Sequence, residues 1–386
     1  MKGALSFALL AKQQGITELI LPKQNAAEAS LVEGVKSIGV ASLGQALAYL
    51  EKRIEIEPAV AVPELLFAQD REIQMSWIKG QEYAKRALEI TAAGGHNLFM
   101  FGPPGGGKSL LAKALPSILP KLHFQEALEV TKIYSVAGLL GENQTLLQSR
   151  PFRSPHHISS DVSLVGGGTP PRIGEITLSH RGVLFLDEFP EFRRDVLESL
   201  RQPLEDGRIT ITRARYDVSY PARFMLVAAS NPCPCGYLNS PDRACTCSIA
   251  SIAMYRRKLS GPLMDRMDLF IEVPALKYEK LVEPDANNAS ASVKENIEKA
   301  RAVQKARFAN DHILVNAEMN IQDIKKYCSH DVKSQNLLKQ YVDSGKLSAR
   351  GYHRVLKVAR SIADLAGSEY IAYGHIAESL MYRLKT

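Results

Sequence analysis

Eight consecutive residues, Gly102-Pro103-Pro104-Gly105-Gly106-Gly107-Lys108-Ser109, match the pattern of a phosphate-binding loop, or P-loop. Glycines allow backbone N–H groups to turn toward phosphate oxygens, and the helix that follows adds partial positive charge. Lys108 would reach the β- and γ-phosphates, and the Ser109 hydroxyl would bind Mg²⁺. The stretch therefore predicts binding of a nucleoside triphosphate together with Mg²⁺.

Three further polar residues follow apolar runs that are typical of buried strands. Asp187 and Glu188 come directly after Leu186, and Asn231 follows the run that ends at Ala229. Because α/β proteins bind ligands at the carboxyl ends of their strands, we expect these side chains near the P-loop. Asp187 would hold Mg²⁺, Glu188 would polarise the attacking water, and Asn231 would hold that water near the γ-phosphate.

Four of the five cysteines are concentrated in one short stretch. They form two Cys-x-Cys pairs, with turn-forming residues between them. Four thiolates can surround one tetrahedral Zn²⁺, so the pattern predicts a structural zinc site, with a redox pair or free thiols as alternatives. The predicted ligands are Cys233, Cys235, Cys245 and Cys247.

Two arginines near apolar elements could act on a γ-phosphate. Arg266 precedes the last apolar strand, where ring-forming ATPases place an arginine that enters the neighbouring subunit's site. The alternative is an ion pair with Asp265 or Asp268 of the same chain. Arg350 begins a helix and could reach the γ-phosphate across the domain cleft, and Arg354 is the alternative one turn later.

Other candidate contacts come from loops and turns. Ile78 and Gly80 precede the helix that leads into the P-loop strand, where they would either line the nucleotide base or simply form the entry to that helix. Arg213 and Arg215 lie at the tip of a predicted hairpin, where they would contact a DNA backbone or remain solvated. His156 and His157 are adjacent and are expected to have a structural or loop-contact role rather than to bind a metal.

The elements that must position these residues alternate between strands and helices. We predict a partial segment at 1–57, linkers at 58–72 and 281–292, a nucleotide-binding core at 73–280 and a helical region at 293–386. Within the core, the cysteine cluster occupies 233–247. The predicted fold class is α/β, with parallel strands that deliver their polar residues to one edge.

Composition is that of a globular protein, with 45% apolar and 23% charged residues among 386. The net charge of +7 and a pI near 9.0 permit a polyanionic partner such as DNA. No apolar run is long enough to span a membrane, and the region after Met1 lacks a signal-peptide pattern, so we expect a cytoplasmic protein.

These motifs together resemble the magnesium-chelatase-like family of AAA+ ATPases, and within it the ComM/YifB-type competence-protein branch. The resemblance spans nearly the whole chain and rests on six stretches: 102–109, 150–157, 183–188, 231–236, 263–269 and 347–360. It implies a three-layer α/β/α P-loop domain with a C-terminal α-helical lid. In that family Lys108 and Ser109 match Walker A, Asp187 and Glu188 Walker B, Asn231 sensor 1, Arg266 the arginine finger and Arg350 the sensor-2 arginine.

Residues 1–57 resemble the C-terminal half of an α+β Lon-protease-like domain, of the ribosomal S5 domain 2 type, so we expect a truncated chain. The resemblance implies a hexameric ATPase that moves on DNA as a helicase or branch-migration motor during natural transformation. The alternatives are the metal-insertion motor of a magnesium chelatase and a chaperone-like remodeller of protein complexes. DNA would stimulate the ATP turnover of a DNA motor, and proteins would stimulate that of a remodeller. A chelatase motor would support ATP-dependent chelation together with its partner subunits.

Overall fold

The computed structural model describes residues 1–60, 73–141, 144–168, 172–213, 216–238, 243–259, 261–275, 289–311 and 313–383. At 212, 213, 216, 289 and 290 only the backbone is described. Arg215, the side chain of Arg213 and most of the two predicted linkers lie outside these residues. The DNA-contact prediction at the hairpin tip therefore stays a prediction.

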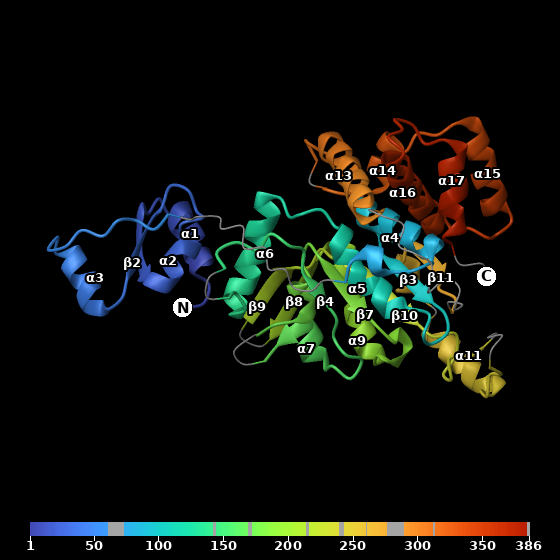
Figure 1. Ribbon diagram of the computed structural model, residues 1–386, viewed down its shortest axis with the longest axis horizontal. Coiled ribbons are helices and arrows are strands. Elements are labelled where there is room, and N and C mark those ends of the chain that lie inside the picture. The colour runs from blue at the N-terminus through green and yellow to red at the C-terminus, as the bar shows by residue number, and fades with distance from the viewer. Residues whose placement is uncertain are drawn as a thin grey trace.

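A five-stranded parallel sheet forms the centre of the molecule (Figure 1). The strands lie side by side in the order β11, β3, β10, β7, β4. Each strand is a short apolar run, as expected for parallel strands that are covered on both faces. Their bounds are β3 (Leu98–Phe101), β4 (Phe152–Arg153), β7 (Val183–Leu186), β10 (Met225–Ser230) and β11 (Leu269–Glu272).

Successive side chains of these strands point into two different cores. Leu98 and Met100 belong to one buried cluster, whereas Phe99 belongs to the other. The first cluster includes α4 (Glu82–Gly94) and α5 (Lys108–Ile118), and the second includes residues of α7 (Asp161–Val165) and α9 (Arg194–Ser199). The period of two along each strand thus produces the predicted α/β/α layering, which is confirmed.

Five helices form the C-terminal region, drawn in orange and red in Figure 1. Helix α16 contributes Val355, Leu356, Ala359 and Ala363 to its core and also packs against α4, which joins this region to the P-loop domain. The predicted helical C-terminus is confirmed. The helices are α13 (Ala289–Arg307), α14 (Ile321–Tyr327), α15 (Val332–Asp343), α16 (Ala349–Leu365) and α17 (Tyr373–Met381).

The N-terminal segment has the predicted alternation of helices and strands. Its elements are α1 (Ala4–Gln13), β1 (Glu18–Pro22), α2 (Lys23–Ala29), β2 (Lys36–Val40) and α3 (Leu43–Leu50), and the two strands are parallel. The backbone N–H of Gly3 donates a hydrogen bond to Ser135 Oγ at 3.0 Å, which ties the segment to α6 (Phe124–Ala137). Its likeness to a Lon-protease-like domain stays a prediction.

Short elements fill the stretches between the main strands. The apolar spacing of Val196, Leu200 and Leu204 predicts one helix over 192–204, but the structure has two, α9 and α10 (Arg201–Asp206). The helix breaks because Pro203 has no N–H to donate to the carbonyl of Ser199. The hairpin is present as β8 (Arg208–Arg213) and β9 (Tyr216–Pro221). The remaining elements are β5 (Gly166–Gly167), β6 (Arg172–Ile173), α8 (Glu175–Leu178) and α11 (Ile249–Lys258), with single 3₁₀ turns at Met75–Trp77, Phe189–Glu191, Met264–Arg266 and Asn316–Glu318.

None of the helices within the described residues has the length and apolar character that crossing a membrane requires.

Candidate nucleotide site

The P-loop connects β3 to α5 at the carboxyl edge of the sheet. Gly107 precedes α5 with φ of +88°, a left-handed conformation that an L side chain rarely adopts. At Gly102 the limit is space, since a Cβ would lie 2.1 Å from the carbonyl oxygen of Val273. Both glycines are therefore required by the backbone path, and the loop has the geometry that a phosphate cradle needs.

Lys108 is buried, and its ammonium group is held inside the loop. Its Nζ donates to the carbonyl oxygens of Gly102 at 2.7 Å and Pro103 at 2.9 Å, and to Asn231 Oδ1 at 3.1 Å. Burial lowers the pKa of Lys108, and the charge of Asp187 opposes that effect. A phosphate group would compensate this buried cation with a full negative charge. Asn231, from the neighbouring strand β10, thus lies directly beside the P-loop.

Ser109 and Asp187 bring two oxygen ligands together at the predicted Mg²⁺ position. Ser109 Oγ donates to Asp187 Oδ2 at 2.5 Å, although the two residues lie on different strand ends. A hydroxyl and a carboxylate are donors that Mg²⁺ accepts, with water and phosphate oxygens as its other ligands. The residues present therefore fit the ion that the P-loop pattern implies.

Glu188 has two unusual features next to this pair. Its φ is +51°, an uncommon conformation for a residue other than glycine, and such conformations concentrate at functional sites. Its Oε2 lies 3.0 Å from His157 Nδ1, and the imidazole also contacts the ring of Phe192 edge-on. His157 therefore contacts Glu188, the residue that was predicted to polarise the attacking water.

The other residues of the 150–157 stretch have structural partners. Arg150 forms a two-pronged ion pair with Glu126, at 3.2 and 2.9 Å, and Arg153 forms one with Glu175, at 2.5 and 2.7 Å. These pairs fasten α6 and α8 to the two ends of β4. They hold the loop that presents His157 to Glu188.

Ile78 and Gly80, the two residues predicted to line the base, differ in how deeply they are buried. Ile78 is buried in the core cluster that includes α4, and Gly80 is half-buried. Gln81, which the sequence prediction did not select, contacts the cradle itself. Its Nε2 donates to the carbonyl oxygens of Pro274 at 2.7 Å and Gly106 at 3.3 Å. Ile78 and Gly80 as base contacts stay predictions.

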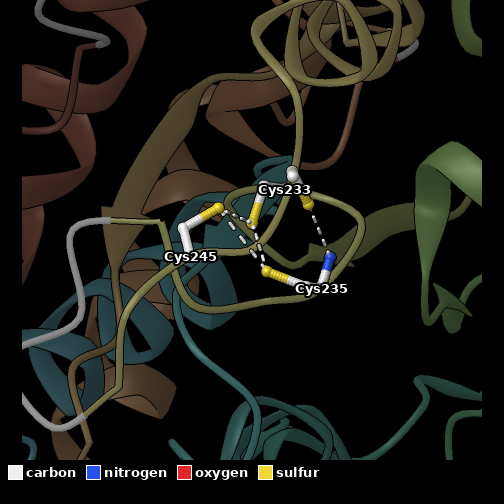
Figure 2. Close-up of side chains that lie close together, drawn as sticks. Cys233, Cys235 and Cys245 are labelled. Carbon is white, nitrogen blue, oxygen red and sulfur yellow. Dashed lines mark hydrogen bonds between the residues drawn. The ribbon is translucent and has the colours of Figure 1, made fainter.

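The first of the four clustered cysteines, Cys233, lies two residues beyond Asn231. The four cysteine sulfurs lie within 4.8 Å of one another, and Figure 2 labels Cys233, Cys235 and Cys245. The Sγ atoms of Cys233, Cys235 and Cys245 are separated by 3.4, 3.5 and 3.7 Å. Tetrahedral zinc with Zn–S bonds of about 2.3 Å holds its sulfurs about 3.8 Å apart, whereas a disulfide needs about 2 Å. All are free thiols, and backbone hydrogen bonds from Tyr237 and Thr246 lower the pKa of Cys235 to about 5. The donor set and spacing fit a tetrahedral metal.

The loop that carries these cysteines packs against the P-loop. A Cβ on Gly236 would lie 2.7 Å from Cδ of Pro104, so the cysteine loop and the P-loop are in direct contact. Farther along, the Tyr255 hydroxyl lies 3.3 Å from Ser230 Oγ, immediately before Asn231. The cysteine loop therefore supports both the cradle and the residue that contacts Lys108.

Comparison with known proteins agrees with this geometry. Residues 74–281 match the family described as magnesium chelatase, subunit ChlI, and residues 287–383 match its C-terminal counterpart. The chain belongs to the magnesium chelatase family. The predicted resemblance to these AAA+ ATPases is thereby confirmed, with the α/β/α domain and helical C-terminus that it implies.

Relatives within and around the magnesium chelatase family differ in how much of the chain they match. Competence protein ComM of Haemophilus influenzae is 42% identical over 384 residues, which cover 97% of this chain and 73% of that protein. YifB of Escherichia coli is 40% identical over 99% of this chain and 74% of its own length. The magnesium-chelatase 38 kDa subunit of Rhodobacter capsulatus is 28% identical over 41% of this chain and 49% of that subunit.

In this member of the magnesium chelatase family, Arg266 and Arg350 lie at the opposite edge of the sheet from the P-loop. Arg266 is mostly buried; its Nη1 donates to the Pro262 carbonyl at 2.5 Å, and it pairs with Glu205. Arg350 Nη1 lies 3.4 Å from Asp265 Oδ2. The helical region thus places Arg350 beside Asp265, and its action on a γ-phosphate as the sensor-2 arginine stays a prediction.

Arg354 lies in the same group and has a firm structural partner. Its Nη1 donates to Asp268 Oδ1 at 2.5 Å, and together with Arg266 it lines a cavity of about 440 Å³. Burial, followed by the nearby Arg350 and Arg354, lowers the pKa of Arg266. Each of these three cations also lies beside a carboxylate, those of Glu205, Asp265 and Asp268.

Proposed function

We propose that this chain hydrolyses ATP in the presence of Mg²⁺ and acts on DNA as a subunit of a hexameric ring, in the manner of a helicase or branch-migration motor. The observation that supports ATP hydrolysis is the convergence of side chains from three neighbouring strands. They are Lys108 and Ser109 after β3, Asp187 and Glu188 after β7, and Asn231 after β10.

Each of these side chains has a distinct task in the proposed reaction. Lys108 would exchange its carbonyl partners for phosphate oxygens, and Ser109 with Asp187 would hold Mg²⁺, which supplies charge neutralisation between the phosphates. Asn231 would position the attacking water. Glu188 would accept its proton once the carboxylate leaves His157. Because water attacks the phosphate directly in this proposed reaction, no covalent intermediate is needed.

Two observations support DNA as the substrate. The relative with 42% identity is named a competence protein, and the chain has a net charge of +7. The decisive experiment measures ATP turnover with and without single-stranded, duplex and branched DNA, together with the mass of the oligomer. Stimulation by DNA that falls steeply with salt supports the proposal. Absence of DNA binding and of stimulation would refute it, and stimulation by proteins alone would indicate a protein remodeller.

The second candidate function is a metal-insertion motor. The matched family descriptions name a magnesium chelatase subunit, which favours this reading. The match to a chelatase subunit covers only 41% of the chain, however, whereas the match to ComM covers 97%. ATP-dependent chelation with added partner subunits would reverse the order of the two candidates.

In the proposed ring, Arg266 serves the nucleotide of the neighbouring subunit. We expect Arg266→Ala to lower turnover of the assembled protein by about 1,000-fold while the subunit still binds ATP, because the lost guanidinium would stabilise only the transition state. Mixing this variant with Lys108→Ala should restore turnover, since the second variant supplies an intact arginine to an intact cradle.

Glu205→Gln is the matched control for that experiment. It removes the ion partner of Arg266 and leaves the guanidinium in place, so turnover should stay within about threefold of the parent. Failure of the mixture to regain activity, with both variants assembled, would contradict a role between subunits.

We also propose that Cys233, Cys235, Cys245 and Cys247 hold a structural Zn²⁺. Protein purified without added metal should contain about one Zn²⁺ per chain, and Cys245→Ser should lose most of it. Cys328→Ser, at a buried cysteine of the helical region, is the control and should retain the metal. Four titratable thiols and no zinc in the parent would remove the proposal. Cysteines that bind a metal as thiolates and form no disulfide agree with a reducing compartment, so we place the protein in the cytoplasm.

A further inference from the structure

A segment between β10 and β11 extends away from the body of the molecule. It comprises the described residues 233–238 and 243–259, here called the cysteine arm, and it ends in α11, the gold helix in Figure 1. Tyr255 is the one residue of α11 that is buried. Ile249 and Met254 are 88% and 69% exposed, so the helix has hardly any packing partner within the described part of the chain.

The charge of the cysteine arm has a single sign. Arg243, Arg256, Arg257 and Lys258 are all exposed, and the described residues of the arm include no aspartate or glutamate. In the sequence, Asp242 is the sole acidic residue between Cys233 and Leu259, and it lies outside the described residues. Three of these cations are consecutive at the end of α11. Such a surface attracts a regular polyanion.

An arginine and a tyrosine contact each other beside the four cysteines. The guanidinium carbon of Arg243 lies 4.6 Å from the ring centroid of Tyr237, so the two planar groups are in contact. Aromatic rings and guanidinium planes are the groups on which unpaired bases stack. A guanidinium can also bind a carboxylate, but a carboxylate has no planar base that would use the neighbouring ring as a stacking partner. Phosphate-binding cations and a stacking pair on one arm together favour single-stranded nucleic acid over an acidic protein.

The base of the arm is attached to the nucleotide cleft. Gly236 lies against Pro104 of the P-loop, and Tyr255 contacts Ser230, which immediately precedes Asn231. A ligand at the exposed end would therefore bind to an element whose other end lies against the hydrolytic residues.

We propose that the cysteine arm binds single-stranded nucleic acid, with Arg256, Arg257 and Lys258 on phosphates and the Tyr237–Arg243 pair on a base. This inference rests on the proposed action on DNA and adds a contact surface separate from the hairpin tip at Arg213 and Arg215. The four cysteines, by closing the loop around a metal, would hold the stacking pair in place.

The test measures the affinity of the full chain for a fluorescent single-stranded oligothymidylate over a series of salt concentrations. Replacing the three α11 cations by glutamine should weaken binding by about 30-fold at low salt. It should also reduce the slope of log affinity against log salt by about 2, since each phosphate contact on a single strand contributes about 0.7. Zinc content and ATP affinity of the variant report whether it is folded.

A charge-matched variant shows whether the effect is local. It replaces three exposed cations elsewhere, each of which pairs with an acid of its own helix or turn, and should bind within about threefold of the parent. The test variant is Arg256→Gln/Arg257→Gln/Lys258→Gln, and the matched variant is Arg193→Gln/Arg194→Gln/Lys299→Gln.

The stacking pair is tested separately. Tyr237→Ala should lose about tenfold in affinity, whereas Tyr237→Phe, which keeps the ring, should bind like the parent. Equal losses in the test and matched variants would overturn the proposal, as would competition by polyglutamate as strong as that by oligothymidylate at equal charge. A parent that binds no DNA at all would refute the proposed function as well, whereas a parent that binds while the α11 variant is unaffected refutes this inference alone.

Discussion

Replacing Lys108 by alanine is expected to abolish ATP binding. The ammonium group is buried inside the loop, where it would make charge-assisted hydrogen bonds to two phosphates, each contributing about 1.5–3 kcal/mol. Together these contacts correspond to a loss of about 1,000-fold in affinity. Equilibrium titration with a fluorescent ATP analogue measures the effect.

Lys113 provides the matched control because it lies on the same helix and is exposed. Lys113→Ala should bind ATP like the parent and unfold at the same temperature. Unchanged ATP affinity in Lys108→Ala, with a normal unfolding curve, would show that the cradle is not the nucleotide site.

Glu188→Gln is expected to preserve ATP binding and to stop hydrolysis. The amide has nearly the shape of the carboxylate and can still contact His157, but it cannot accept a proton from water. Loss of such a base lowers the rate by about 100- to 10,000-fold. Single-turnover hydrolysis of bound ATP separates this chemical step from binding and release.

The control for the second variant is Glu191→Gln, three residues further on and exposed. Its turnover should equal that of the parent. Rapid hydrolysis by Glu188→Gln would assign the proton acceptor to another residue, and weakened ATP binding would indicate that the left-handed backbone at this position had changed.

Sequence reasoning located the residues of the cleft because each of them follows a local pattern. Lys108 and Ser109 belong to one contiguous motif, and Asp187 and Asn231 follow apolar runs that can hardly be anything but buried strands. Parallel strands then bring their ends together, as the contacts of Lys108 with Asn231 and of Ser109 with Asp187 show. Their tasks in hydrolysis stay predictions.

Contacts that depend on tertiary packing were not accessible in this way. His157 reaches Glu188 from a loop after the two-residue strand β4, which carries no periodic pattern. The place of Arg350 beside Asp265 depends on how the helical region packs on α4, and no short stretch encodes that angle. Pro203, in contrast, is a local signal for the break between α9 and α10, which the prediction of a single helix over 192–204 did not use.

The contact between Gly236 and Pro104 has a practical consequence for biochemistry on this protein. If the four cysteines hold zinc as proposed, a chelator added to stop ATP turnover would withdraw that zinc along with magnesium, and the loop packed against the P-loop would lose its support. Restoring magnesium alone would then leave the enzyme inactive, and the preparation would resemble a defective P-loop variant. Recovery of ATP turnover after a trace of zinc is added under reducing conditions would show that the protein had lost zinc from the cysteine loop and that its nucleotide site was intact.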